Sequence, residues 1–417
     1  MRVKRINEDM NYADSILFVP AMLDMHFPLI KYAFYSKDYY PVVMDEEDGI
    51  TETGLKYINH DMCYPLSQIV GQMVNALNSG RYDVNRVKLL MPAAGDACRG
   101  ANYVGALRRA MQDAGYGCVP VLTLNVRGVE PESMMKFDFP MVWRAMFGMF
   151  YGDILMVLLH ATRPYEKKKG AADRLWNKWI KIISRDMIAG KNLSLLAMHR
   201  NFRLMCRDFA RIRRKGERKQ VIGLVGELYV KYCHLGNWDV VDFIEKQGAE
   251  IHVNPLSYYA LYYMDTHMIR KHNLEAKGAR LLMKLFEMIQ KDMIKALEKY
   301  DYFSLPPYWQ FKKEAHGLVN YNVRNGDGWL IGAEAVGYIK HGVEKVFAAQ
   351  PFGCMVNHCA GRGLYPSLTR KLGKGSIVST DVDASASKLN YYNRLLMLIQ
   401  VDSSMLCGNE DEVKERE

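Results

Sequence analysis

The 417-residue sequence lacks most of the short motifs that identify an enzyme directly. It contains no GxxxxGK[ST] phosphate loop, no HExxH metal motif, no GxSxG turn and no CxxC pair. Glycine pairs such as Gly95 and Gly100 are too loosely spaced for a dinucleotide fingerprint. We therefore expect the chain to have no ATP site of its own and not to hydrolyse ATP.

Cysteines are few and long uncharged apolar runs are missing. Eight cysteines in a chain of this length are too sparse for a disulfide scaffold. Residues 1–14 are polar and a short apolar run follows, so we expect no signal peptide, reduced thiols and a cytoplasmic protein. The most apolar stretch, residues 141–159, contains Arg144 and Asp153. It is predicted to be a buried helix, with no membrane association.

Acidic residues are fewer than basic residues, with 46 Asp and Glu against 56 Lys and Arg, so the formal net charge is +10. This balance favours anionic partners, either nucleic acid or small phosphates such as nucleotides and coenzyme A. The densest basic run, residues 200–219, includes RIRRKGERK. It is either a nucleic-acid patch or a solvated helix that ends in a basic linker. We favour the linker, and expect no nucleic-acid partner, because no aromatic stacking platform is interleaved with the basic run.

Short apolar runs of strand length alternate with amphipathic helical stretches along the chain. This alternation predicts an α/β fold with parallel sheets that are covered on both faces. Two largely helical stretches interrupt it, and together they suggest two similar α/β halves that meet near residue 220. Strands are predicted at residues 15–19, 40–44, 87–91, 118–124, 221–226, 250–253, 343–348 and 376–381. Residues 22–36, between the first two strands, are predicted to form one helix.

The predicted boundaries follow from these interruptions. Residues 1–220 form the N-terminal half, with a helical insertion at 138–220. Residues 221–407 form the C-terminal half, with an insertion at 256–340. Residues 408–417, which are polar and strongly charged, are expected to be a disordered tail.

Three cysteines stand at loop-to-helix junctions, each beside glycine or proline. Cys98 follows a predicted strand at its carboxyl end, where open α/β sheets bind ligands. Cys354 follows a second strand in the same way, and Cys63 precedes an amphipathic helix with Pro65 near its first turn. Helix N-terminal amides and Arg99 would favour a thiolate at Cys98. Spacing alone leaves a shared site and three ordinary core cysteines both open.

Seven ordered motifs resemble the 2-hydroxyacyl-CoA dehydratase superfamily. The similarity is to the branch of the acyl-CoA dehydratase activase-related proteins, here in a stand-alone form without the actin-like ATPase domain. It covers almost the whole chain. The motifs are MCYPLSQIVGQ, GDACRGANY, TRPYE, VGELYV, GDGW, QPFGCM and TDVDASASKLNYYNR.

The resemblance implies two Rossmann- or flavodoxin-like halves with helical additions. It also implies a [4Fe–4S] cluster held by Cys63, Cys98 and Cys354, whose sulfurs we expect about 3.5–4 Å apart. Three thiolates would leave one iron open to a substrate thioester, which a Lewis-acidic role requires. In dehydratases of this superfamily a separate ATP-dependent activase injects one low-potential electron. Here that activase, or another low-potential donor, must be a partner.

The resemblance leaves several residues without a settled role. Cys359 is either a neighbour of the cluster or a fourth ligand that closes it, and the family pattern favours three ligands. Charge and position suggest substrate contacts or a buried polar network for a further group. Its members are Arg99, Arg163, Tyr165, Glu166, Glu227 and Asn393.

Three functions stay open at this point. The first is an iron–sulfur enzyme that accepts an electron from an activase for reductive dehydration or reduction of a CoA thioester or related anion. The second is a non-catalytic [4Fe–4S] protein of electron transfer or cluster assembly. The third is a zinc-stabilised nucleic-acid-binding protein, which rests on the positive charge and the basic run.

Overall fold

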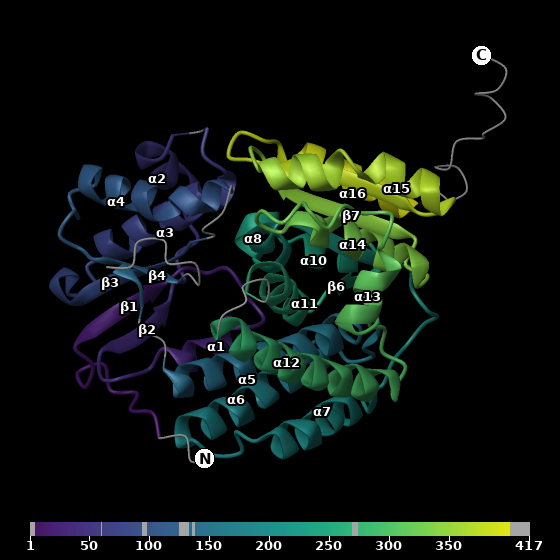
Figure 1. The fold of residues 1–417 in the computed structure, drawn as a ribbon, viewed down its shortest axis with the longest axis horizontal. Coiled ribbons are helices and arrows are strands. Elements are labelled where there is room, and N and C mark those ends of the chain that lie inside the picture. Colours follow the sequence, from purple (N-terminus) through teal and green to yellow (C-terminus); the bar gives the residue numbers. More distant parts are fainter. Residues whose placement is uncertain are drawn as a thin grey trace.

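Two four-stranded parallel sheets, one on each side of residue 220, form the framework of this computed structural model (Figure 1). The first sheet has the order β2-β1-β3-β4 and the second the order β6-β5-β7-β8. All neighbouring strands run parallel, which confirms the α/β class. The structure describes residues 5–59, 61–93, 98–124, 133–135, 138–268 and 274–400, so the predicted tail at 408–417 lies outside the described residues.

The strands lie close to their predicted positions. The first sheet contains β1 (Ser15–Val19), β2 (Tyr39–Val43), β3 (Val87–Pro92) and β4 (Val121–Leu124). The second contains β5 (Val221–Gly226), β6 (Glu250–Val253), β7 (Lys345–Pro351) and β8 (Ser376–Val382).

Both sheets share one strand order, so each has an equivalent switch point. In each half the second strand lies on one side of the first strand, and the third strand lies on its other side. The switch points are therefore β1/β3 and β5/β7. In open α/β sheets ligands bind outside the carboxyl ends of the strands at such points. The fold thus predicts two ligand crevices.

The second switch point depends on one glycine. Gly226 ends β5 with φ at +145°, a backbone conformation that favours glycine. A Cβ there would lie 1.8 Å from the carbonyl oxygen of Ala349 on β7. The two central strands can therefore approach closely only because this position has no side chain.

The helices cover the sheets and add a separate helical layer below them in the view of Figure 1. The first half carries α2 (Ile50–Tyr57), α3 (Tyr64–Asn78), α4 (Tyr103–Asp113), α5 (Phe139–His160), α6 (Ala171–Ala189) and α7 (Leu195–Ala210). The second carries α8 (Leu228–Tyr232), α9 (His234–Asn237), α10 (Val240–Lys246), α11 (Leu256–Tyr263), α12 (Leu274–Glu298), α13 (Tyr308–Glu314), α14 (Gly328–Lys340), α15 (Tyr365–Leu372) and α16 (Lys388–Gln400).

The apolar helix α5 lies in the core, as predicted. Among the described residues, the segment Phe139–Tyr165 is the one helix long and apolar enough to cross a membrane, and 83% of its most apolar window is buried inside the protein. Asp153 is fully buried in it, yet its carboxylate accepts hydrogen bonds from the backbone N–H groups of Leu256 and Ser257. Asp153 therefore caps the start of α11, so the acid in this apolar helix has a structural partner within the core.

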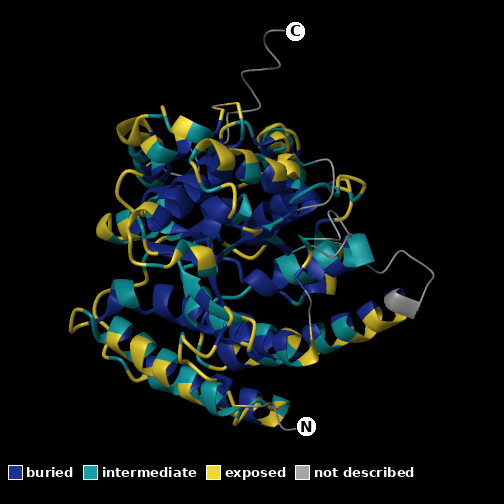
Figure 2. Ribbon diagram, turned by 90° about the vertical axis from the view of Figure 1, so that its left-hand side faces the viewer, coloured by how far each residue is buried: buried dark blue, intermediate teal, exposed yellow. Residues whose placement is uncertain are grey.

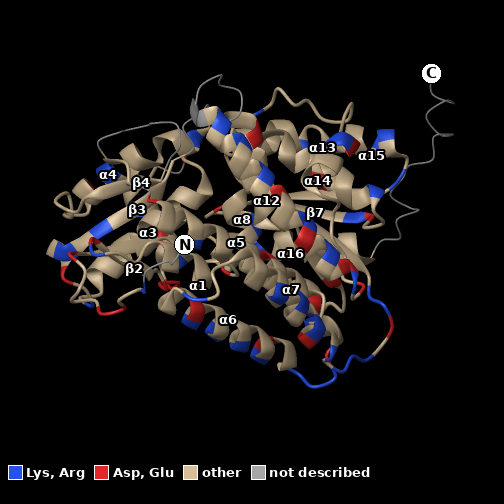
Figure 3. Ribbon diagram, turned by 60° about the horizontal axis from the view of Figure 1, so that its bottom comes forward, with Lys and Arg blue, Asp and Glu red and all other residues tan. Residues whose placement is uncertain are grey.

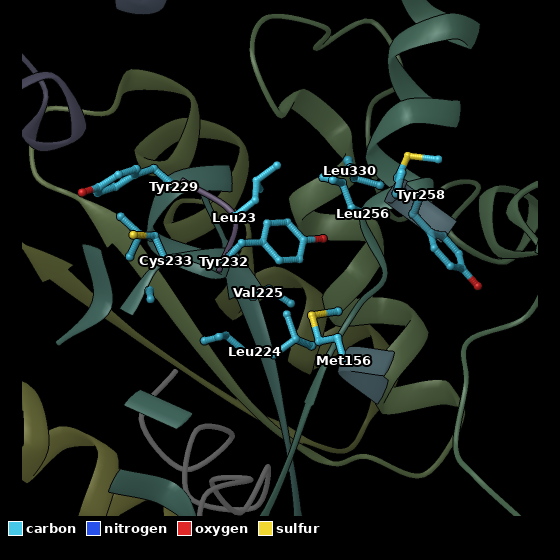
Figure 4. Close-up of a cluster of buried hydrophobic side chains, with 14 of the residues drawn as sticks. Leu23, Met156, Leu224, Val225, Tyr229, Tyr232, Cys233, Leu256, Tyr258 and Leu330 are labelled. Carbon is cyan, nitrogen blue, oxygen red and sulfur yellow. The ribbon is translucent and has the colours of Figure 1, made fainter. Parts of the chain in front are cut away.

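The two halves share one hydrophobic core. Figure 4 shows Leu23 of the first half and Met156 of α5 beside Leu224 and Val225 of β5. Tyr232 of α8 lies in the same cluster. Figure 2 shows this buried interior running through the sheets and the helical layer.

One predicted helix is wrong. Residues 22–36 were expected to be one helix, but only α1 (Phe27–Ile30) and a 3-10 turn (Lys31–Ala33) form there. The segment before α1 instead reaches the other half, where the N–H of Asp24 donates to the carbonyl of Tyr232. His26 is fixed by Asp153 at 2.8 Å, and Pro28 fits only in a first helical turn.

Two smaller expectations also fail. The strand expected from residue 118 begins at Val121, because Val119 closes a turn with Tyr116 before Pro120. The helical insertion expected to reach residue 220 ends with α7 at Ala210. Residues 211–220 are a largely exposed basic linker, visible as the blue stretch after α7 in Figure 3.

Candidate metal centre

A cavity of about 380 Å³ lies at the carboxyl ends of the central strands. Cys63, Cys98 and Cys354 all line it, although they come from three separate motifs and from both halves. Two carboxylic acids, Glu227 and Asp327, share the wall. The rest is mostly apolar or backbone: Met22, Pro65, Pro92, Ala93, Gly100, Tyr103, Leu124, Leu228, Tyr259, Tyr263, Gly326, Pro351 and Val356.

Cys63 occupies the N-cap of α3 and is almost completely buried. Its Sγ lies 2.6 Å from the phenolic oxygen of Tyr103, the first residue of α4. Burial raises the pKa of the Cys63 thiol to about 11, and the hydrogen bond with Tyr103 opposes that shift. A thiol with such a pKa stays protonated at neutral pH unless a metal ion binds its sulfur.

Cys98 lies at the start of the short 3-10 helix Arg99–Asn102 that leads into α4. Its sulfur accepts a hydrogen bond of 3.4 Å from the N–H of Gly100. The GDGW loop packs its backbone against this sulfur, since a Cβ on Gly326 would lie 3.5 Å from it. Gly326 has a positive φ of +52°, so glycine suits both the turn and the close approach.

Cys354 follows β7 and is also buried. The side-chain amide of Asn357 donates a hydrogen bond of 3.2 Å to its Sγ. Burial raises the pKa of this thiol strongly, and the nearby Glu227 carboxylate acts in the same direction. The hydrogen bond from Asn357 would stabilise a thiolate there.

Arg99 connects the three cysteine loops. Its guanidinium donates to the backbone carbonyl of Asp61, two residues before Cys63. A Cβ on Gly353, the residue before Cys354, would lie 3.0 Å from Arg99 Nη1. Arg99 itself is exposed and directly follows Cys98. One side chain thus lies against all three loops.

The two cavity acids share one wall, where the Glu227 carboxylate accepts a hydrogen bond of 3.1 Å from the N–H of Val230. Burial raises the pKa of Glu227, the residue directly after β5, to about 7. The pKa of Asp327 rises well above its usual value through burial and the neighbouring Glu227. Behind them Lys231 forms a buried ion pair with Glu334, with 2.8 Å between Nζ and Oε1. Both acids of the cavity therefore keep their protons to a higher pH than the same groups do in water.

The three sulfurs do not form the compact group that the sequence led us to expect. Among the described residues, one group of three His, Cys, Asp or Glu ligand atoms lies within 4.8 Å of one another, and the cavity cysteines are not that group. The expected separation of about 3.5–4 Å is therefore wrong for the set of three. One tetrahedral ion with sulfur ligands at about 2.3 Å would need sulfurs about 3.8 Å apart. In a cluster each thiolate binds its own iron, so the wider arrangement suits a cluster better than a single zinc ion.

The compact group is Asp24, Cys233 and His234, at the contact between the halves. The Asp24 carboxylate accepts hydrogen bonds from both the N–H of His234 and its Nδ1, at 2.7 and 2.8 Å. The sulfur of Cys233 donates to the carbonyl of Ala21. These atoms satisfy one another, so the group acts as a link between the halves.

Cys359 does not line the cavity. It lies in the π-helix Asn357–Arg362 and is exposed. The structure thus brings together the three cysteines predicted as ligands and leaves the possible fourth apart from them.

Apart from Glu227 and Arg99, the predicted polar residues lie away from the cavity. Arg163 pairs with Glu245 at 2.6 Å. Tyr165 donates to Glu250 at 2.7 Å, within a polar network that also receives the basic linker. Glu166 accepts hydrogen bonds from the backbone at the start of α6, and Asn393 is exposed on α16.

Tyr103, Asp327 and Asn357 are site residues that the sequence analysis did not single out. Tyr103 and Asp327 stand inside the motifs GDACRGANY and GDGW, and Asn357 follows QPFGCM by two positions. Their position in or next to these motifs was the one signal in the sequence that could have identified them as site residues. Their role became visible only when the fold placed them around the cysteines.

The comparisons with known proteins add no family: no protein-family model and no curated protein matches this chain. The case for a function therefore rests on the motifs and on the geometry of the cavity.

Proposed function

We propose that Cys63, Cys98 and Cys354 hold a [4Fe–4S] cluster with one iron open, and that the protein works in the manner of a 2-hydroxyacyl-CoA dehydratase. It would accept a low-potential electron from an activase-type partner for reductive dehydration or reduction of a CoA thioester or related anion. One observation carries the proposal: three cysteines from distant motifs line one cavity at the sheet ends.

The donor set and its surroundings fit such a group. Soft thiolates suit iron–sulfur clusters. Hydrogen bonds reach all three sulfurs, from Tyr103, Gly100 and Asn357. Contacts of this kind orient metal ligands and tune the potential of the metal. The bare backbone at Gly326 leaves room beside the sulfur of Cys98.

When bound, the cluster would supply a reducing electron and a Lewis-acidic iron. The chain itself would bind the acyl part of the substrate against the apolar wall, next to Tyr259 and Tyr263. Glu227 lies on the same wall with a pKa raised to about 7, which suits a group that gives or takes a proton near neutral pH.

The function is tested by the EPR spectrum of the reduced, anaerobically reconstituted protein. Addition of a 2-hydroxyacyl-CoA should change the spectrum, because one iron is open. Cys359→Ala should give the same spectrum and the same response. A cluster that ignores every thioester in the wild type, yet responds to ligands in Cys359→Ala, would identify a closed electron-transfer site.

A further inference from the structure

Two basic runs that are far apart in the sequence lie side by side in the fold. One is the KKK run at residues 167–169, and the other is the linker at residues 211–219, drawn in blue after α7 in Figure 3. The first run holds three Lys and Arg and the second holds six, whereas Glu217 is the one acid in either run. Every one of these cations except Lys219 is exposed. We call the two runs together the basic surface.

Backbone hydrogen bonds hold the two runs together. The N–H of Lys167 donates to the carbonyl of Arg213 at 2.8 Å, and the N–H of Lys215 donates to the carbonyl of Tyr165 at 2.8 Å. This pattern is a short antiparallel bridge. The N–H of Lys219 also donates to the phenolic oxygen of Tyr165, at 3.0 Å. The backbone of the basic surface is therefore held in place before a partner arrives, which lowers the entropy cost of binding.

The bridge also determines where the side chains point. Arg214 turns toward the protein, where its guanidinium donates to the phenolic oxygen of Tyr302 at 2.8 Å and lies 5.1 Å from the centre of that ring. Successive side chains of an extended segment point to opposite sides. Arg213 and Lys215 therefore point away from the protein on the same side, and both are exposed.

The acids that stand next to the two runs in the sequence are engaged elsewhere. Asp208 pairs with Arg207 at 3.1 Å, and Asp173 pairs with Arg163 at 3.4 Å. Glu166 accepts hydrogen bonds from the backbone at the start of α6. The basic surface therefore keeps most of its positive charge, which attracts polyanions over a distance.

The basic surface offers charge and little else. Ile212, its one apolar side chain, packs against the hydrophobic core. The large apolar side chains that are exposed in the described part of the chain, such as Leu196 and Trp309, belong to other segments. Protein partners are usually bound around an apolar or aromatic centre, and membrane-bound amphipathic helices insert an apolar face. Single-stranded nucleic acid requires aromatic rings on which its bases stack.

We propose that the basic surface binds the phosphate backbone of double-stranded nucleic acid without reading its sequence. A duplex stacks its bases inside and presents its phosphates outward, so exposed Lys and Arg are sufficient to bind it. We expected no nucleic-acid partner from the sequence because the linker lacks stacking rings, but a duplex does not require them. The fold also adds the KKK run, which enlarges the positive surface beyond the linker.

The basic surface lies away from the cysteine cavity. The linker leads into the amino end of β5, whereas Glu227 of the cavity follows the carboxyl end of that strand. The six residues of β5 separate these two points by about 20 Å. Binding of a duplex therefore depends neither on the cluster nor on the proposed function.

The test is fluorescence anisotropy of the whole chain with labelled DNA and RNA duplexes of mixed sequence and about 20 bp, long enough to cover a protein domain. Two triple variants each remove three charges from one run. They are Lys167→Gln with Lys168→Gln and Lys169→Gln, and Arg211→Gln with Arg213→Gln and Lys215→Gln. The control removes three charges from exposed positions outside the basic surface, with Lys37→Gln, Lys313→Gln and Lys371→Gln.

Wild-type binding should weaken steeply with salt, because the duplex releases counterions when the cations bind. Each lost phosphate contact reduces the slope of log K against log salt concentration by about 0.9, so each triple variant should reduce it by about 2–3. At about 50 mM salt each should weaken binding at least about tenfold. The control should bind as the wild type does. All three variants should keep the wild-type melting temperature, because they change exposed side chains and leave the backbone hydrogen bonds in place.

Comparable losses in the two triple variants support the proposal, and the relative affinities for the two duplexes show whether DNA or RNA is preferred. A loss in the Arg211 variant alone would show that the two runs do not act together, and would overturn the proposal. An equal loss in the control would show that net charge alone attracts the duplex, and would overturn it too.

Two competitors separate a duplex from other polyanions. Polyglutamate that displaces the duplex at an equal concentration of charges would identify an acidic protein as the partner. Phosphatidylserine vesicles that bind the chain when neither duplex binds would identify an anionic membrane. Each of these results refutes a nucleic-acid partner, as does a wild type that binds neither duplex at low salt.

Discussion

Replacing Lys231 by Met should destabilise the protein strongly, because it leaves Glu334 buried without its counter-charge. The ammonium of Lys231 lies 2.8 and 3.1 Å from the two carboxylate oxygens of Glu334. Their side chains are 3% and 1% exposed. The amide of Asn254 is the further donor to this carboxylate among the described residues. Met keeps the length of the Lys stem, so the charge is the main loss.

The expected loss is about 3–5 kcal/mol of the free energy of unfolding, the range for removing one partner of a buried pair. That is a large part of the roughly 5–15 kcal/mol typical of a folded protein. A second substitution, Glu334→Leu, removes the isolated charge, so the double variant should recover most of the loss. Lys291→Met is the control, since Lys291 pairs with Glu287 on the surface of α12 and should contribute at most about 0.5 kcal/mol.

Urea unfolding followed by far-UV circular dichroism measures these differences in metal-free protein. The reasoning fails if Lys231→Met behaves like Lys291→Met. It also fails if the double variant is less stable than Lys231→Met, because the isolated carboxylate would then not be the source of the loss.

Two further predictions concern the contact between the halves and the centre of the second sheet. The hydrogen bond that His234 donates to Asp24 raises the pKa of His234 from 6.5 to about 9, so its stabilisation is complete below pH 6.5 and is lost as the pH rises through 9. The stability difference between wild type and His234→Gln, measured by urea unfolding, should shrink over that interval, and a constant difference would exclude the charged pair. Gly226→Ala should lower the free energy of unfolding by about 2 kcal/mol or more, because the new Cβ meets the carbonyl of the next strand. Gly80→Ala, with φ at +69° and no atom within 4 Å of the new Cβ, should lose only about 1 kcal/mol, and equal losses would show that backbone strain alone acts at both positions.

The sequence predicted the framework well because buried parallel strands have a strong local signature. β1, β5 and β6 have the predicted bounds, and their apolar runs end at loop residues. The helix expected at 22–36 failed for a reason that no local pattern shows. Asp24 and His26 are held by His234 and Asp153, which lie far away in the chain.

The candidate site could be predicted only in part from the sequence. Three cysteines at the ends of strands and the starts of helices could be expected to meet, because the topology brings those ends to one edge. The partners of Arg163 and Tyr165 could not be anticipated, since Glu245 and Glu250 belong to the other half. The position of Cys354 relative to Cys63 and Cys98 depends on how the two halves pack, and the three sulfurs do not form the compact group that the sequence analysis expected.

Iron and sulfide content after anaerobic reconstitution tests the central claim most directly. The wild type should hold about four irons and four sulfides per chain. Cys206→Ala, which alters a buried cysteine away from the cavity, should hold the same amount, whereas Cys354→Ala should lose most of both. A Cys354→Ala protein that is folded by circular dichroism and still carries the full iron and sulfide would contradict the account.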